Sequence, residues 1–132
     1  MTHFRISEAA ALIGVSDDTV RRWVSDGALD AGADDAGRQT VTGASLARRA
    51  LELAPAPDAT DPVRRSARNR FTGIVTAVQR EGLVAQVELQ CGPNRVVSLM
   101  TAEALDDLAI EVGSRATGIV KATTVIIEAE RR

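Results

Sequence analysis

Residues 83–90 read Leu-Val-Ala-Gln-Val-Glu-Leu-Gln, in which Leu83, Ala85, Val87 and Leu89 alternate with a second set that is mostly polar. Successive side chains of a β-strand point to opposite faces, so this period predicts a strand with one buried face. Glu81-Gly82 before it and Cys91-Gly92-Pro93-Asn94 after it are typical of turns. We therefore expect antiparallel neighbours on both sides, and a small β domain in the second half of the chain.

The neighbouring segments complete a five-stranded pattern. Further strands are predicted at Phe71–Gln79, Arg95–Met100, Arg115–Lys121 and Thr123–Glu128, with a short helix over 102–109 that Thr101 caps. Gly73 falls where a strand bends sharply or another backbone comes close. Five short strands with one helix between the third and fourth follow the order of an OB-like Greek-key barrel.

A proline-rich segment separates this domain from the first half. Residues 53–62 hold three of the four prolines and show neither helical nor strand period. We interpret 55–65 as an extended linker stiffened by proline. The predicted fold class is α+β with two domains, one over residues 1–54 and the other over residues 66–132.

The first half is predicted to be mainly helical. The expected elements are a helix over Ile6–Ile13 with Ser7 as N-cap, a second helix capped by Ser16 and ended by Gly27, a hairpin or wing over Asp30–Thr40, and a third helix capped by Thr42. Val20, Trp23 and Val24 form one apolar stripe on the second helix. Two helices around Gly14-Val15 have helix-turn-helix spacing.

Phe4-Arg5-Ile6-Ser7-Glu8-Ala9-Ala10 and Val15–Trp23 resemble the winged-helix DNA-binding domain of MerR-type regulators and phage excisionases over about the first 52 residues. The resemblance implies double-stranded DNA as partner, with the Ser16–Asp26 helix in the major groove. Its implied DNA-binding residues are Ser16, Thr19, Arg21, Arg22 and Arg38. The long dimerising helix typical of MerR regulators is missing, so dimerisation would come from the second half.

A protein-interaction role for the first half stays open. Residues 1–52 hold six Arg against eight acidic residues, a net charge of −2. Such a balance does not favour strong non-specific binding to nucleic acid. Trp23 is predicted as a core residue rather than a contact. The adjacent Arg21 and Arg22 still favour DNA binding, because base readout needs only a few well-placed side chains.

Lys121 is the only lysine among sixteen basic residues. Together with Ser66-Ala67-Arg68-Asn69-Arg70 and Met100-Thr101-Ala102 it offers cations and hydroxyls, and no carboxylate stands among these positions. This composition suits an anion that carries no proton at neutral pH, because a tetrahedral oxyanion such as molybdate needs only hydrogen-bond donors. Each residue alone also has an ordinary explanation, such as a helix cap for Thr101.

These segments, with Gly73-Ile74-Val75 and Gly118-Ile119-Val120-Lys121-Ala122-Thr123, closely resemble the molybdate-binding Mop domain (molbindin, TOBE-like) over nearly all of residues 66–132. The resemblance implies a molybdate or tungstate site at a subunit interface. Its implied donors are Ser66, Arg68, Lys121, the backbone at Ala122, Thr123, and Thr101 of a neighbouring subunit. Ala104 stands where the family often has Ser.

Composition limits the remaining classes. The 132 residues are 45% hydrophobic but only 2% aromatic, so two small cores of aliphatic side chains are expected and oligomerisation, as a dimer or hexamer, would support them. The single Cys91 excludes an internal disulfide, and neither it nor His3 has metal-ligand spacing. We expect a cytoplasmic protein with no membrane partner, no metal site and no catalytic constellation, hence no enzyme.

Two functions follow from these patterns. The first is a molybdate- or tungstate-responsive, DNA-binding transcriptional regulator of molybdate homeostasis. The alternative is an intracellular store or buffer of molybdate whose helix-turn-helix is an interaction module.

Overall fold

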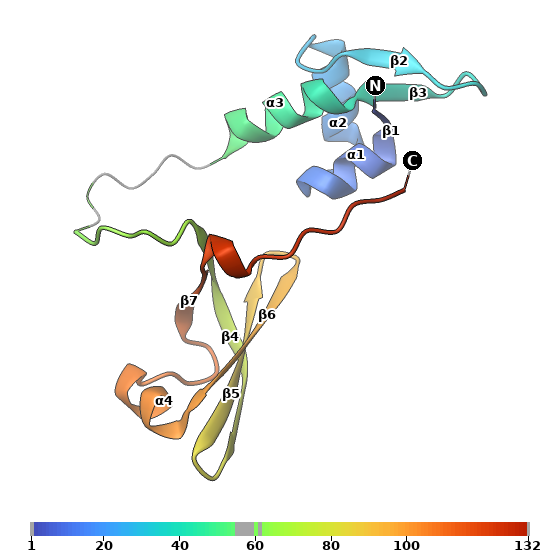
Figure 1. The fold of residues 1–132 in the computed structure, drawn as a ribbon. Helices are drawn as coiled ribbons and strands as arrows, with labels where there is room; N and C mark the ends of the chain where they lie inside the picture. Colours follow the sequence, from blue (N-terminus) through green and yellow to red (C-terminus); the bar gives the residue numbers. More distant parts are fainter. Residues whose placement is uncertain (1, 55–59, 61, 132) are drawn as a thin grey trace. The chain divides into compact units, whose positions relative to one another are not determined.

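The computed structural model describes residues 2–54, 60 and 62–131, which group into two compact units, Met1–Thr60 and Asp61–Arg132 (Figure 1). The predicted linker at 55–65 coincides in part with residues 55–59 and 61, which lie outside the described ranges. The chain has the predicted mixture of helices and antiparallel sheets. No helix within the described ranges is long and apolar enough to cross a membrane.

Unit 1 (Met1–Thr60) combines three helices with a three-stranded antiparallel sheet of order β1-β3-β2. Its elements are β1 His3–Arg5, α1 Ile6–Ile13, α2 Asp17–Ser25, β2 Ala31–Ala33, β3 Gln39–Thr42 and α3 Gly43–Leu53. Val20 and Trp23 of α2 are buried with Ala9 of α1 and Leu46 of α3. The core role predicted for Trp23 is confirmed.

Two of the three helix caps predicted in unit 1 are confirmed. The Ser16 hydroxyl accepts the Thr19 N–H at 3.1 Å, and the Thr42 hydroxyl accepts the Ser45 N–H at 3.2 Å, as predicted. The prediction of Ser7 as the cap of α1 is wrong, because Arg5 holds that position. Ile6 is buried in the core, so the helix must begin early enough to place Ile6 beside Ala9 and Ala10.

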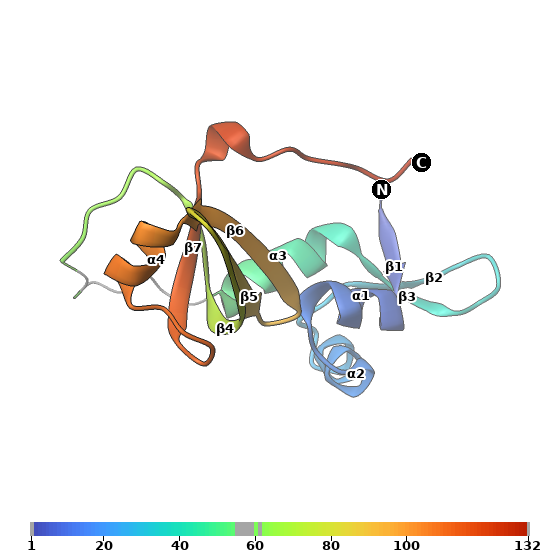
Figure 2. The same ribbon diagram turned by 90° about the horizontal axis from the view of Figure 1, so that it is seen from below.

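Unit 2 (Asp61–Arg132) is built on a four-stranded antiparallel sheet of order β6-β5-β4-β7, which curls rather than lying flat (Figures 1 and 2). Its elements are β4 Asn69–Glu81, β5 Val84–Cys91, β6 Asn94–Thr101, α4 Ala102–Leu108, β7 Arg115–Val120 and the 3₁₀ turn η1 Ala122–Thr124. Ala85, Val87 and Leu89 of β5 are buried together with Cys91, which confirms the alternation over these residues. They form one core with Val75 of β4 and Leu105 of α4. Leu83, predicted on the same buried face, precedes β5 in the turn and is 87% exposed.

The segment Thr123–Glu128, predicted as a fifth strand, lies outside this sheet. It begins within η1, where the Thr124 N–H donates to the Lys121 carbonyl at 3.0 Å and turns the chain away from the β4–β7 pairing. Its apolar side chains remain, but Ile126 and Ile127 are 89% and 82% exposed. A strand needs a partner edge as well as an apolar pattern, so the protomer has a curled four-stranded sheet in place of the predicted five-stranded barrel.

Candidate functional site

Ser66, Ala67, Lys121, Ala122 and Thr123 line one hollow of about 360 Å³, called here the Lys121 hollow. Pairing between β4 and β7 explains why two segments more than fifty residues apart meet. Asn69 at the start of β4 pairs with Val120 at the end of β7, and the Asn69 Nδ2 donates to the Val120 carbonyl at 3.2 Å. The residues just before β4 and just after β7 therefore come together at the same end of the sheet (Figure 1).

The groups in the Lys121 hollow can donate hydrogen bonds. It has the Lys121 ammonium and the hydroxyls of Ser66 and Thr123, and none of the described residues that line it is Asp or Glu. The turn that contains Lys121 is stabilised by Thr124, whose N–H and hydroxyl both donate to the Lys121 carbonyl, at 3.0 Å and 2.9 Å. A tetrahedral dianion would find a cation and hydroxyl donors here without a competing carboxylate.

Two of the predicted oxyanion-binding residues do not join this group in the protomer. Arg68 is exposed and is not among the lining residues. Thr101 pairs with Val84, which also pairs with Glu81, so it lies at the opposite end of β4 from Asn69. Measured along its path, β4 is about 40 Å long, because its 13 residues rise roughly 3.3 Å each, and Figure 1 shows α4 and η1 at opposite ends of the sheet. Thr101 and Lys121 of one protomer thus cannot bind the same small ion.

The Thr101 hydroxyl caps α4 by accepting the Ala104 N–H at 3.1 Å. The ordinary explanation of Thr101 as a helix cap is therefore correct. A hydroxyl that accepts a hydrogen bond keeps its own proton for donation, so the cap leaves Thr101 able to donate to a ligand.

A larger hollow of about 690 Å³, which no sequence pattern predicted, lies near the β4–β5 turn and is lined by Gln79, Arg80, Glu81, Val84, Gln86 and Leu99. Arg80 donates to both carboxylate oxygens of Asp106 at 2.7 Å. This hydrogen-bonded pair raises the pKa of Arg80 and lowers the pKa of Asp106, so both stay charged at neutral pH. With Arg80 already paired and the Glu81 carboxylate in its wall, this hollow is a poorer place for a dianion than the Lys121 hollow, despite its size. Apolar residues at outward-facing strand positions, here Val84 and Leu99, were the sequence feature that could have indicated this hollow.

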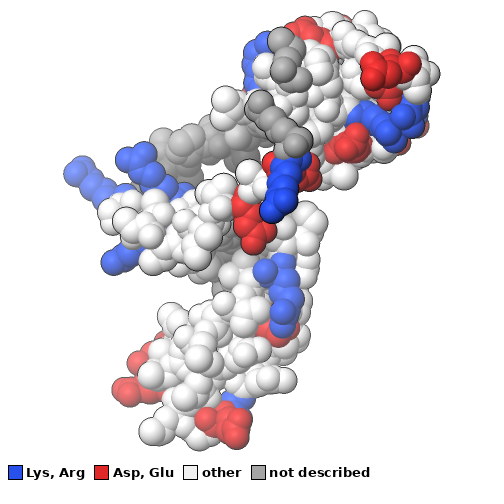
Figure 3. Space-filling view, turned by 45° about the vertical axis from the view of Figure 1, so that its right-hand side comes forward, with Lys and Arg blue, Asp and Glu red and all other residues white. Residues whose placement is uncertain are grey.

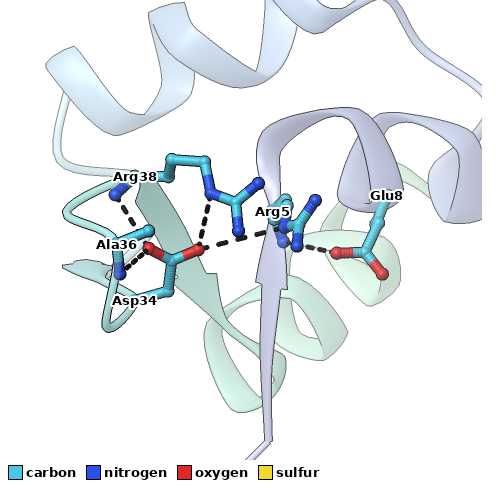
Figure 4. A network of polar contacts seen from close by, with 5 residues as sticks. All are labelled: Arg5, Glu8, Asp34, Ala36 and Arg38. Atoms are coloured by element: carbon cyan, nitrogen blue, oxygen red, sulfur yellow. Dashed lines mark hydrogen bonds and ion pairs between the residues drawn. The ribbon is translucent and has the colours of Figure 1, made fainter.

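In unit 1 the five predicted DNA-binding residues are largely engaged with neighbours. The hydroxyls of Ser16 and Thr19 lie 2.9 Å apart at the start of α2. Arg21 donates to Asp18 at 3.0 Å, and Arg38 donates from Nε to Asp34 at 3.0 Å (Figure 4). Arg22 is exposed on α2. On the face shown in Figure 3, basic and acidic patches of this unit alternate, so the face is not uniformly basic.

The second unit has recognisable relatives. The TOBE domain family matches residues 65–127. Molybdenum-pterin-binding protein 3 of Clostridium pasteurianum is 35% identical over 63 residues, which are 47% of this chain and 93% of that protein. Molybdenum transport protein ModE of Herbaspirillum seropedicae is 32% identical over 63 residues, again 47% of this chain but 23% of that protein. The solved structure of MopII from Clostridium pasteurianum aligns with a TM-score of 0.47 and 31% identity, over 50% of this chain and 100% of that one.

Proposed function

The chain belongs to the TOBE domain family through residues 65–127, and on that premise we propose that it binds molybdate or tungstate as part of a DNA-binding transcriptional regulator of molybdate homeostasis. Proteins of this family that bind molybdate act as binding proteins or as regulators. The chain is accordingly a binding protein rather than an enzyme.

The observation that carries the ligand proposal is the donor set of the Lys121 hollow. Hydrogenphosphate has an O–H that would find no carboxylate acceptor among the described lining residues. Most of these residues are exposed in the protomer, so the full cost of leaving that O–H unpaired applies once a second copy closes the site, as proposed below. Molybdate and tungstate carry no proton at neutral pH. Sulfate has the same charge and shape but is smaller, so discrimination against it rests on size.

Calorimetric titration of the purified chain tests this proposal. We expect saturable binding of molybdate and of tungstate, and binding of sulfate and hydrogenphosphate that is weaker by about 100-fold or more, in line with one unpaired polar group or a poor fit. Equal affinities for molybdate and hydrogenphosphate would contradict a donor-only site. Equal affinities for molybdate and sulfate would contradict selection by size.

We further propose that the site is completed between two copies of unit 2, with Arg68 supporting it and Thr101 coming from the neighbouring copy. Thr101 and Lys121 lie at opposite ends of the sheet, so they can share a ligand only across protomers. Several apolar side chains are also left exposed, including Leu99 at 71% and Ile126 at 89%. Burial of such side chains stabilises oligomers, which supports a dimer or a hexamer.

The regulator part of the proposal rests on unit 1. Its order of α1, a turn at Gly14, α2 and the β2–β3 hairpin fits a winged helix-turn-helix, with Arg21 and Arg22 exposed on α2. A ligand that joins two protomers can change the relative placement of the two copies of α2, to the extent that it prefers one arrangement. Storage without DNA binding is the second candidate, favoured by the alternating charges in Figure 3.

An electrophoretic mobility shift separates the two candidates. Duplex DNA from upstream of the chain's own gene should be retarded at moderate salt, and Arg21→Ala/Arg22→Ala should weaken the complex by about tenfold or more, as expected for lost base or phosphate contacts. The control Arg64→Ala/Arg65→Ala removes the same two charges outside α2 and should have a smaller effect. Storage is favoured if no duplex is retarded with or without molybdate.

A further inference from the structure

A third hollow, of about 300 Å³, lies in unit 1 between α1, α2 and the β2–β3 hairpin. Three arginines from different elements line it: Arg5 before α1, Arg21 on α2 and Arg38 before β3. Asp17 is also in its wall, and Arg21 donates from Nη1 to Asp18 at 3.0 Å, so the hollow has acids beside its cations as the larger hollow of unit 2 does. It differs from that hollow in having three arginines rather than one among the described lining residues. Arg21 and Arg38 are among the residues that the resemblance implies for DNA binding, and Arg5 is not.

Asp34, in the loop between β2 and β3, contacts two of these arginines, Arg5 and Arg38 (Figure 4). Its Oδ1 accepts the N–H groups of Ala36 at 3.0 Å and Arg38 at 2.9 Å. Its Oδ2 accepts the Arg38 Nε at 3.0 Å and lies 3.9 Å from the Arg5 Nε. The hydrogen bond from the Arg38 backbone is the main cause that lowers the pKa of Asp34, so the carboxylate is charged at neutral pH.

The contacts with Asp34 leave much of each guanidinium available. Both use Nε, while a guanidinium has five N–H donors, four of them on the terminal nitrogens. The side chain of Asp34 is 25% exposed, against 52% for Arg5 and 55% for Arg38. The Asp34 carboxylate is thus less exposed than the two arginines, so it can hold both guanidinium groups in place while they face solvent.

We propose that this hollow receives one phosphodiester group of duplex DNA, held by Arg5, Arg21 and Arg38, and that Asp34 is the positioning residue that aims Arg5 and Arg38. This inference rests on the proposed DNA binding and adds Arg5 and Asp34 to it. The planar guanidinium fork matches phosphate oxygens in a bidentate manner. Contacts of this kind fix the register of a protein on the duplex rather than reading its sequence.

The role of Asp34 can be tested by the sign of one substitution. An acidic side chain beside DNA repels phosphate, so Asp34→Asn should tighten binding if the carboxylate only repels. If Asp34 aims the two arginines, the same change should weaken binding although it removes a negative charge. Asn keeps an oxygen for the N–H groups of Ala36 and Arg38, so the loop itself should persist.

The experiment follows binding of the full chain to a fluorescently labelled duplex of mixed sequence across a salt titration. Arg5→Gln should lower affinity by about five- to tenfold near 0.1 M salt and reduce the slope of log K against log salt by about one. Asp34→Asn should also weaken binding, and it should have no further effect in an Arg5→Gln/Arg38→Gln background. A purely structural role of Asp34 would persist in that background.

Matched controls distinguish failure of this inference from failure of the regulator proposal. Arg48→Gln removes an exposed arginine of α3, and Asp35→Asn removes the neighbouring acid of the same loop; neither should weaken binding as the test variants do. If the unaltered chain binds no duplex at low salt, both the regulator proposal and this inference are overturned. Two outcomes overturn only this inference. In the first, the unaltered chain binds duplex and Arg21→Ala/Arg22→Ala weakens binding, but Arg5→Gln has the same affinity as Arg48→Gln. In the second, Asp34→Asn tightens binding.

Discussion

Replacing Lys121 with Ala is expected to weaken molybdate binding by about 30-fold or more, or roughly 2 kcal/mol, when the proposed second copy of unit 2 closes over Lys121, which is exposed in the protomer. Lys121 is the only cation among the described residues that line the hollow. Without it, a dianion would keep the hydroxyls of Ser66 and Thr123, which carry no compensating charge, and would depend on Arg68, which does not line the hollow in the protomer. Calorimetric titration with molybdate measures the loss.

Two variants make this result specific. Arg115→Ala removes one positive charge from the other end of β7 and should leave the affinity nearly unchanged, since Arg115 pairs with Ile74 rather than with the residues near Asn69. Lys121→Arg keeps the charge with a different shape and should retain part of the binding. Light scattering of each variant shows whether the oligomer persists. Undiminished binding in Lys121→Ala would place the ligand elsewhere.

The sheet of unit 2 was predictable because one strand dominates it. The apolar residues of β5, from Ala85 to Cys91, all face the core, and their alternation is visible without any tertiary information. The turns at Gly82 and Gly92 both require a left-handed backbone, with φ of 60° and 58°, which glycine adopts without strain. Local chemistry and tertiary structure agree at these positions, so the prediction succeeded.

The unpredicted features depend on partners distant in sequence. Thr123–Glu128 has the apolar pattern of a strand, but whether it pairs depends on which edges the protomer leaves free. Asp34 pairs with Arg38 within its own loop, but its contact with Arg5 arises because β3 lies between β1 and β2, an order that no local pattern specifies. The separation of Thr101 from Lys121 within one protomer likewise follows from strand order. The expectation that Thr101 comes from a neighbouring subunit rests on the family resemblance, because no local pattern specifies that distance.

Gly73→Ala is expected to destabilise unit 2 by about 3 kcal/mol or more, at or beyond the upper end of ordinary overpacking. A Cβ at this position would lie 2.2 Å from the Gln90 carbonyl oxygen and 2.8 Å from the Cys91 Sγ. Gly73 immediately precedes Ile74, which pairs with Gln90 where β4 and β5 begin their ladder. The added methyl would therefore force apart two strands of the sheet that positions the Lys121 hollow. Urea unfolding monitored by circular dichroism measures the change.

The nature of the obstacle distinguishes this prediction from a general sensitivity of glycines in the sheet. At Gly118 on β7 the closest atom to an added Cβ is the Val96 Cγ1 at 3.2 Å, a side-chain atom, so Gly118→Ala should cost about 1 kcal/mol, since a small shift relieves it. Adding Cys91→Ala to Gly73→Ala removes the sulfur but leaves the Gln90 carbonyl, so it should not restore stability. Equal stabilities for Gly73→Ala and Gly118→Ala, or recovery in the double variant, would show that β4 and β5 do not approach each other as closely as the structure places them.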